Sequence, residues 1–225
     1  MKIAVIAGTI MDTKMGYDIL KAEGLDCLDF PVAKTPKEQT QLQYSGKEKV
    51  EEVTRNVIKE AISHGCDGIF LYCNSLSSSI DYKKLERELN VPIVAPLDCY
   101  AKYSKEYANI AVLAGNGNSA REIERILKES NASNNSILIG NLMLAEAIEE
   151  NMPAEEIISV LALDLMVAYL EKSDYKGNKM EALILGCTHF PYVKNELKKI
   201  TKLVVLDPKD DMIELLKDKV QKSKE

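Results

Sequence analysis

Short apolar runs alternate with amphipathic segments along most of the chain. The apolar runs predict buried strands at 2–7, 25–30, 68–72, 92–95, 109–114, 136–139, 182–185 and 203–206. Helical periodicity is clearest at 47–63, and further helices are predicted after residue 12, around 85–89, and over 142–170, 191–200 and 212–221. Strands that alternate with helices in this way predict an α/β fold with mostly parallel sheets.

Two polar stretches, 33–46 and 173–179, interrupt the pattern, and we expect both to be surface loops. Asp12 or Thr13 is predicted to cap the first helix, because either side chain can accept a hydrogen bond from the first helical turn. The long helical stretch at 142–170 should break near 151–153, where the sequence reads Asn-Met-Pro.

The second half of the chain repeats the first half in outline. Each half begins with a strand, a polar loop and a helix, and each contains a later strand that ends at a cysteine. This repeat predicts two similar, pseudo-symmetric α/β lobes, one formed by 1–96 with 206–225 and the other by 97–205. A cleft between two such lobes is a common place for a small-molecule site.

Composition narrows the class of protein. The net charge of -6 over 225 residues argues against nucleic acid or an anionic membrane as a partner. No apolar run approaches the roughly 20 residues that span a bilayer. Five cysteines without CxxC spacing predict free thiols in a reducing, cytoplasmic compartment. The two histidines lie outside any metal-ligand spacing, so no metal site is expected.

Two cysteines stand at predicted strand ends, one in each half of the chain. Cys73 is followed by Asn74 and Ser75, and Cys187 is followed by Thr188 and His189. Ligands bind at the carboxyl ends of parallel strands in open α/β sheets. If the two thiols face one substrate, one thiolate can remove a proton from a carbon while the other thiol returns a proton to the opposite face. This chemistry needs neither a metal nor a cofactor.

The residues around these cysteines resemble those of a known family. The stretches GCDGIFLYCNSLS (65–77) and LILGCTHFPYV (183–193) are similar to the paired motifs of the aspartate/glutamate racemase superfamily, and of glutamate racemases in particular. YSGKE (44–48) resembles their substrate loop, and VLDPKDD (205–211) resembles their closing strand and turn. The resemblance runs in order over most of the chain.

The resemblance implies a two-lobed, cofactor-independent enzyme that is commonly a homodimer. By the same resemblance, Cys73 and Cys187 are the acid–base pair, His189 assists Cys187, and Glu149 is the carboxylate that orients the histidine. The motifs also imply a set of substrate-binding residues: Gly8, Thr9, Tyr44, Ser45, Gly46, Asn74, Ser75, Asn116, Asn118, Ser119 and Thr188.

The first predicted strand departs from the family pattern. Glutamate racemases end this strand with Asp-Ser-Gly, whose Asp assists the first cysteine, whereas this chain has Ala7-Gly8-Thr9. Asp12, later in the same loop, is the carboxylate that could take its place. The departure weakens the assignment of glutamate as substrate, because aspartate racemases and broad-range relatives also lack that Asp.

The sequence therefore predicts a racemase of a small acidic amino acid, aspartate or glutamate. One alternative is an isomerase or decarboxylase of small dicarboxylic acids on the same scaffold, and another is a non-catalytic protein that binds a small ligand. The run of a thiol, a hydroxyl and an imidazole at 187–189 favours the racemase. Cys27, Cys66 and Cys99 lack such neighbours and are interpreted as bystanders.

Overall fold

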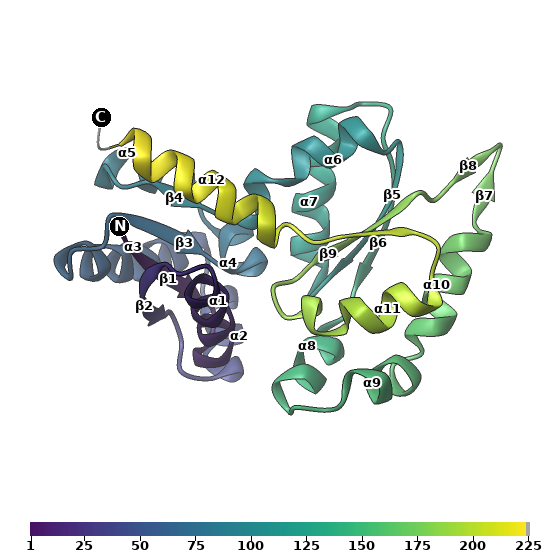
Figure 1. The fold of residues 1–225 in the computed structure, drawn as a ribbon, viewed down its shortest axis with the longest axis horizontal. Helices are drawn as coiled ribbons and strands as arrows, with labels where there is room; N and C mark the ends of the chain where they lie inside the picture. The colour runs from purple at the N-terminus through teal and green to yellow at the C-terminus, as the bar shows by residue number, and fades with distance from the viewer. Residues whose placement is uncertain (224–225) are drawn as a thin grey trace. The chain divides into compact units, whose positions relative to one another are not determined.

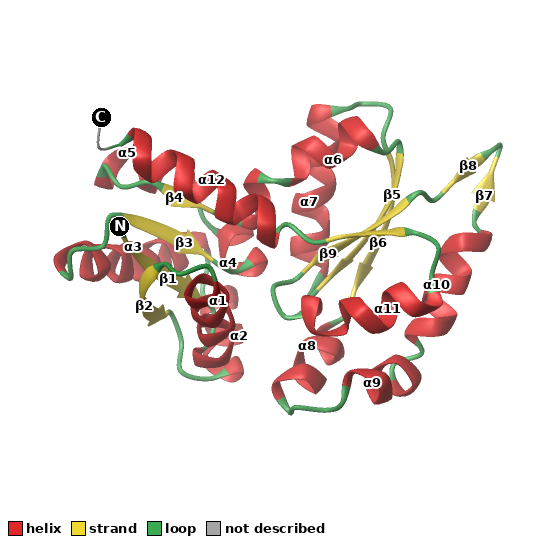
Figure 2. Ribbon diagram, viewed as in Figure 1, coloured by secondary structure: helices red, strands yellow, loops and turns green. Residues whose placement is uncertain are grey.

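The computed structural model describes residues 1–223 and divides into two compact units. The first unit contains Met1–Asp98 and the C-terminal segment that starts at Lys209, and the second unit is Cys99–Pro208. The sequence pattern predicts one lobe from 1–96 with 206–225 and another from 97–205. Both units are α/β structures, each built on a parallel four-stranded sheet (Figure 2).

The sheet of the first unit has the strand order β2-β1-β3-β4. Its strands are β1 (Lys2–Ala7), β2 (Asp26–Pro31), β3 (Gly68–Leu71) and β4 (Ile93–Val94). Its helices are α1 (Ile10–Ala22), α2 (Pro36–Tyr44), α3 (Lys47–Ser63), α4 (Asn74–Ser79), α5 (Tyr82–Leu89), the 3₁₀ turn η1 (Pro96–Asp98) and α12 (Lys209–Lys222). The central strands β1 and β3 are buried on both faces, which explains their continuous apolar sequence.

The sheet of the second unit has the order β10-β9-β5-β6. Its strands are β5 (Asn109–Ala114), β6 (Asn135–Gly140), β9 (Ala182–Gly186) and β10 (Val204–Leu206). Its helices are α6 (Tyr100–Glu106), α7 (Gly117–Ser130), α8 (Leu142–Glu149), α9 (Ala154–Val160), α10 (Leu163–Lys172), the 3₁₀ turn η2 (Phe190–Val193) and α11 (Lys194–Ile200). A two-stranded hairpin, β7 (Asp174–Tyr175) and β8 (Asn178–Lys179), extends from this unit.

The two sheets share one topology (Figure 1). In each unit the first strand lies between the second and third strands, and the fourth strand pairs with the third. The predicted α/β fold with two similar parallel sheets is therefore confirmed. Cys73 follows β3 and Cys187 follows β9, so each cysteine lies just beyond the third strand of its own sheet.

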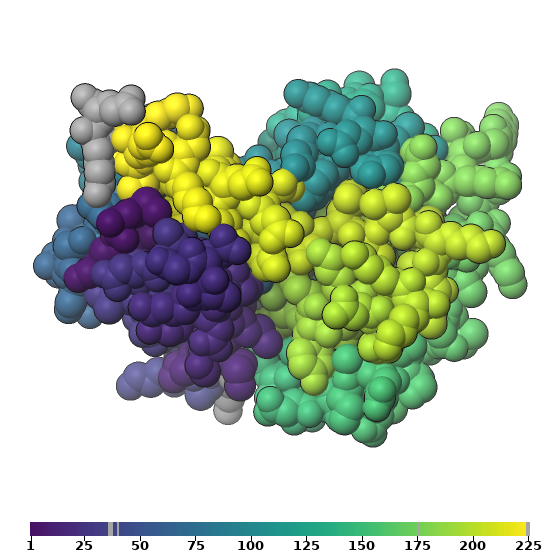
Figure 3. All heavy atoms as spheres, viewed as in Figure 1, coloured from purple at the N-terminus to yellow at the C-terminus, as the bar shows by residue number. Residues whose placement is uncertain are grey.

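Helix α12 returns the chain to the first unit and packs on β3 and β4. Leu216 and Val220 are fully buried there. Lys219 Nζ donates to Glu86 Oε1 at 2.7 Å and to the Ile93 carbonyl at 2.9 Å. Figure 3 shows the outer face of α12 at the surface. Lys217 Nζ pairs at 3.0 Å with Glu23, which is just beyond α1. The last helix thus completes the cover of the first sheet.

Two local predictions were wrong. The stretch 33–46, expected to be a loop, contains helix α2 because Thr35 Oγ1 caps it by accepting from Glu38 N at 3.2 Å, and Pro36 stands at its first turn. The cap of α1 is Thr9 rather than Asp12 or Thr13, since Thr9 Oγ1 accepts from Asp12 N at 3.1 Å.

Smaller differences concern helix and loop boundaries. The segment 173–179 forms the β7–β8 hairpin, and the helical region after residue 142 breaks a second time at Ala162, whose φ is 51°. None of the helices in residues 1–223 combines the length and apolar character needed to cross a bilayer.

Candidate active site

In the second unit, three predicted residues form a chain of contacts. Cys187 Sγ lies 3.6 Å from His189 Nδ1, and His189 Nε2 lies 3.0 Å from Glu149 Oε1. Cys187 and His189 are in the turn between β9 and η2, whereas Glu149 is the last residue of α8. The two ring nitrogens thus face a thiol on one side and a carboxylate on the other.

This contact chain is held by packing around the histidine. His189 is only 7% exposed, and the next residue, Phe190, is fully buried. The Tyr192 hydroxyl donates to the Met152 carbonyl at 3.1 Å, which joins η2 to the loop after α8. A carboxylate on Nε2 stabilises the imidazolium that forms when Nδ1 accepts the thiol proton. The arrangement therefore places a candidate proton acceptor, His189 Nδ1, beside the Cys187 thiol.

The loop after β5 lies beside the same strand end, because β5 and β9 pair through Ala114 and Gly186. A Cβ added at Gly115 would lie 3.3 Å from Cys187 Sγ, so the glycine backbone is in close contact with the thiol. Asn116 caps α7 by accepting from Ser119 N at 2.9 Å. Asn118 is exposed on the first turn of α7, and Ser119 is buried.

In the first unit, Cys73 is itself the cap of helix α4. Its Sγ accepts from Leu76 N at 3.5 Å, and its carbonyl accepts from Ser77 Oγ at 2.8 Å. Asn74 begins the helix and is buried. A second donor reaches the sulfur from α2, because Gln39 Nε2 lies 3.8 Å from Cys73 Sγ.

The first turn of α1 places Asp12 near the end of β1. The Asp12 side chain is buried, and its Oδ2 accepts from Gly8 N at 3.3 Å. Thr9 is also buried, and its carbonyl accepts from the Thr13 hydroxyl at 2.6 Å. Since β1 pairs with β3 up to Ile6 and Leu71, the helix turn that follows β1 and carries this carboxylate lies next to the end of the strand that leads to Cys73.

The residues of the predicted substrate loop lie at the junction of α2 and α3, ahead of the long helix. Tyr44 is the last residue of α2 and is 88% exposed. Ser45 Oγ donates to the Leu42 carbonyl at 2.6 Å, and Gly46 has a positive φ of 95° at the junction with α3. The side chain that reaches the strand end is Gln43, whose Nε2 donates to Ser75 Oγ at 2.5 Å.

The sequence profile of the Asp/Glu/Hydantoin racemase family matches residues 40–216, which is well over half of the chain. The chain belongs to this family. The matched region includes both cysteines, Glu149 and His189, whereas the first loop and the start of α2 lie before it.

Individual relatives of this family member are distant. The glutamate racemase of Aliivibrio fischeri is 27% identical over 163 residues, which cover 70% of this chain and 58% of that protein. The glutamate racemase of Fusobacterium nucleatum subsp. nucleatum is 25% identical over 184 residues, which cover 76% and 64%. The chain thus spans less than two-thirds of the length of these relatives.

Solved structures share the fold of this racemase-family chain. Glutamate racemase from Francisella tularensis, solved with D-glutamate, superposes with a TM-score of 0.79 at 17% identity, covering 99% of this chain and 82% of that one. Aspartate racemase from Picrophilus torridus gives a TM-score of 0.70 at 15% identity, with coverage of 98% and 94%. At such identities the likeness establishes the two-unit α/β fold.

Three residues at the site of this family member were not predicted from the sequence: Gln39, Gln43 and Gly115. The two glutamines are four residues apart, which is the spacing of neighbours on one helix face. The spacing is visible in the sequence, but it indicates that the two side chains share a face only when 36–44 is known to be a helix.

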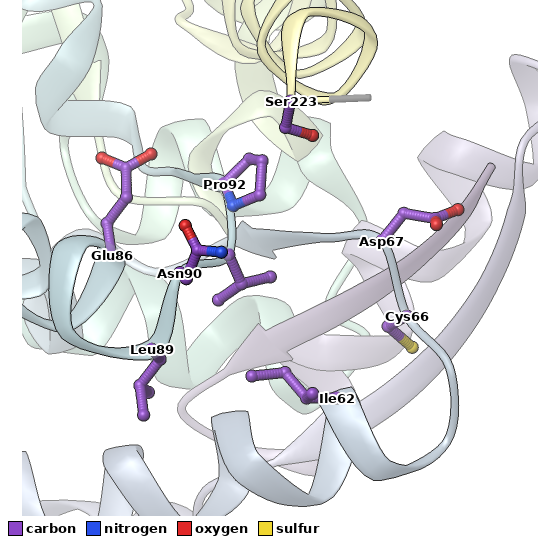
Figure 4. Close-up of a pocket in the computed structure, with 9 residues that line it drawn as sticks. Ile62, Cys66, Asp67, Glu86, Leu89, Asn90, Pro92 and Ser223 are labelled. Atoms are coloured by element: carbon purple, nitrogen blue, oxygen red, sulfur yellow. The ribbon is translucent and has the colours of Figure 1, made fainter. Parts of the chain in front are cut away.

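The remaining cysteines differ from the strand-end pair. Burial raises the pKa of the Cys27 and Cys66 thiols, which disfavours their thiolate forms. Cys66 lines a cavity of about 410 Å³ together with Ile62, Asp67 and Leu89 (Figure 4). Because Asp67 directly precedes β3, this cavity lies at the amino end of the sheet, whereas Cys73 lies at the carboxyl end.

Proposed function

We propose that this protein is a cofactor-independent racemase of a small acidic amino acid, aspartate or glutamate. The observation that carries the proposal is the matched placement of Cys73 and Cys187, each just beyond the third strand of its own sheet. The contact chain from Cys187 through His189 to Glu149 supports the assignment of Cys187 as an acid–base group. Family membership supports the reaction class.

In the proposed reaction one thiol acts as the base and the other as the acid. The Cys73 thiolate removes the α-proton from one face of the amino acid, and the Cys187 thiol donates its proton to the other face. The product is the mirror image of the substrate, and the reverse reaction uses the same groups in swapped roles. His189, with Glu149 behind it, accepts the Cys187 proton when that thiol must act as the base.

Hydroxyl, amide and backbone N–H groups bind the substrate carboxylates in this proposal. On the first unit these are Gly8, Thr9, Asn74 and Ser75, with Tyr44, Ser45 and Gly46 at the end of α2. On the second unit they are Asn116, Asn118, Ser119 and Thr188. The N-terminus of α7 adds a favourable dipole for an anion. Asp12, in the first turn of α1, is the proposed catalytic carboxylate on this side.

We further propose that the enzyme works as a homodimer in a reducing, cytoplasmic compartment. The five cysteines all carry free thiols, which is compatible with such a compartment. The proposal of a homodimer is based on the resemblance to the family. Size-exclusion chromatography with light scattering measures it directly, and a monomer at micromolar concentration would overturn it.

The activity is tested by proton NMR in D₂O with L- and D-aspartate and L- and D-glutamate, without added cofactor. We expect the α-proton signal of one pair to disappear while chiral chromatography shows the opposite enantiomer. Exchange with none of the four, in protein whose thiols are reduced, would exclude this function and favour another small carboxylic acid or a binding role.

Replacement of either thiol should stop the reaction. Cys73→Ser and Cys187→Ser are each expected to lower kcat by at least about a hundredfold, because a hydroxyl is a far weaker acid than a thiol. Cys99→Ser, at a buried cysteine outside the site, is the matched control and should keep activity. Full activity in either strand-end variant would contradict the two-base mechanism.

A further inference from the structure

Helix α2 brings a neutral amide to the first thiol. Gln39 Nε2 lies 3.8 Å from Cys73 Sγ, within hydrogen-bonding range for sulfur. Both side chains are at the carboxyl end of the first sheet, and Cys73 is only 4% exposed. A buried thiolate needs donors to replace water, so this amide has a direct electrostatic effect on the sulfur.

Gly8 provides the space for this contact. A Cβ added at Gly8 would lie 1.9 Å from Gln39 Nε2 and 2.4 Å from Gln39 Cδ, so any other residue would displace the glutamine. Gly8 is not among the residues with positive φ, so backbone conformation does not explain the glycine. The strand end that lacks the family's Asp-Ser-Gly is therefore occupied by a side chain from α2.

The rest of α2 fixes the position of Gln39. Gln43, one turn later on the same helix face, donates to Ser75 Oγ at 2.5 Å. Thr35 caps the start of the helix. The two glutamine side chains thus contact neighbouring residues of the turn after β3: Gln39 contacts the Cys73 thiol, and Gln43 contacts the Ser75 hydroxyl.

We propose that Gln39 is a positioning residue for Cys73: its carboxamide donates to the thiolate, and Gly8 admits it. This inference rests on the proposed function, in which Cys73 is one of two bases. A donor to the charged form stabilises the thiolate, whereas a carboxylate at the same position would disfavour it by like charge. Gln39 therefore supports the base form of Cys73 without adding negative charge beside an acidic substrate.

The test measures alkylation of Cys73 by iodoacetamide against pH, with peptide mass spectrometry separating it from the other cysteines. In Gln39→Leu, Cys73 should react about two- to tenfold more slowly at pH 7, the effect of one lost hydrogen bond. Gln39→Glu should be slower still, and its profile should shift further toward high pH. Gln41→Leu, at an exposed glutamine of the same helix, should match the parent.

A second variant tests the space at Gly8. Gly8→Ala should shift the Cys73 profile as Gln39→Leu does, and the double variant should shift it no further, because both changes remove the same contact. Gly8→Ala keeps Gln39 in the chain, so this single variant tests the contact even if Gln39→Leu folds poorly. A double variant with additive shifts would overturn the role given to Gly8.

Racemisation rates in both directions separate this inference from the proposed function. We expect Gln39→Leu to lower kcat and to shift the pH profile of the direction in which Cys73 is the base. A Cys73 alkylation profile that is the same in the parent, Gln39→Leu and Gln39→Glu would overturn the inference, whether or not the parent is a racemase. A parent that racemises neither amino acid, with shifted alkylation profiles, would overturn only the function.

Discussion

At the scale of single residues, the contact between Glu149 and His189 joins two segments 40 positions apart. Glu149 is partly exposed, but its Oε1 lies against a histidine that is nearly buried. A carboxylate in this position fixes the orientation of the ring and favours the protonated form of the imidazole. The thiol of Cys187 then faces the nitrogen that can accept its proton.

Glu149→Gln removes the charge but keeps an oxygen acceptor of similar size. We expect kcat for racemisation to fall roughly ten- to hundredfold, the worth of one charge-assisted hydrogen bond. Glu150→Gln, at the next and exposed residue, is the matched control. Equal rates in the two variants would show that Glu149 has no part in orienting the histidine.

At the scale of elements, the strands and the long helix α3 were predictable, because each buries a continuous or periodic set of apolar side chains. Helix α2 was not, since its contacts with the sheet end are made by Gln39 and Gln43 rather than by an apolar stripe. The contact between Cys187 and His189 could be predicted because they are two residues apart. The close approach of Gly8 and Gln39 could not be predicted, because it becomes visible only when the structure brings α2 to the end of β1.

Thr35 gives a direct test of how α2 is held. Thr35→Ala removes the side chain that accepts from Glu38 N and should cost about 1 kcal/mol of local helix stability. Hydrogen exchange of the α2 amides should accelerate about fivefold, while exchange in β1 and β3 stays unchanged. Lys34→Ala, at the neighbouring exposed residue, is the control, and equal exchange in both variants would mean that the cap does not stabilise α2.

At the scale of the whole molecule, the chain forms two compact units of the same topology, and the first of them includes a helix from a distant part of the chain. Helix α12 covers β3 and β4 through buried Leu216 and Val220. Burial of Glu86 opposes its ionisation, but the hydrogen bonds from Lys219 and the Ile93 N–H lower the pKa of this carboxyl overall. The first unit is therefore closed by a helix encoded after the second.

Leu216→Ala should leave a cavity under α12 and lower the free energy of unfolding of the first unit by about 2–5 kcal/mol. Hydrogen exchange in urea should show this loss in β1 and β3, with β5 and β9 affected much less. Glu214→Ala, on the exposed face of α12, is the control. A loss of equal size in both sheets would show that the two units unfold as one.

Because α12 belongs to the first unit but follows the second unit in the sequence, it also affects the order in which the two units can fold during synthesis. The second unit is complete once Pro208 has emerged, whereas the first unit still lacks the helix that covers two of its strands. Domains fold as units during synthesis, so the unit formed by Cys99–Pro208 can finish folding before the first unit does. Cys73 then belongs to the unit whose fold is completed after that of Cys99–Pro208.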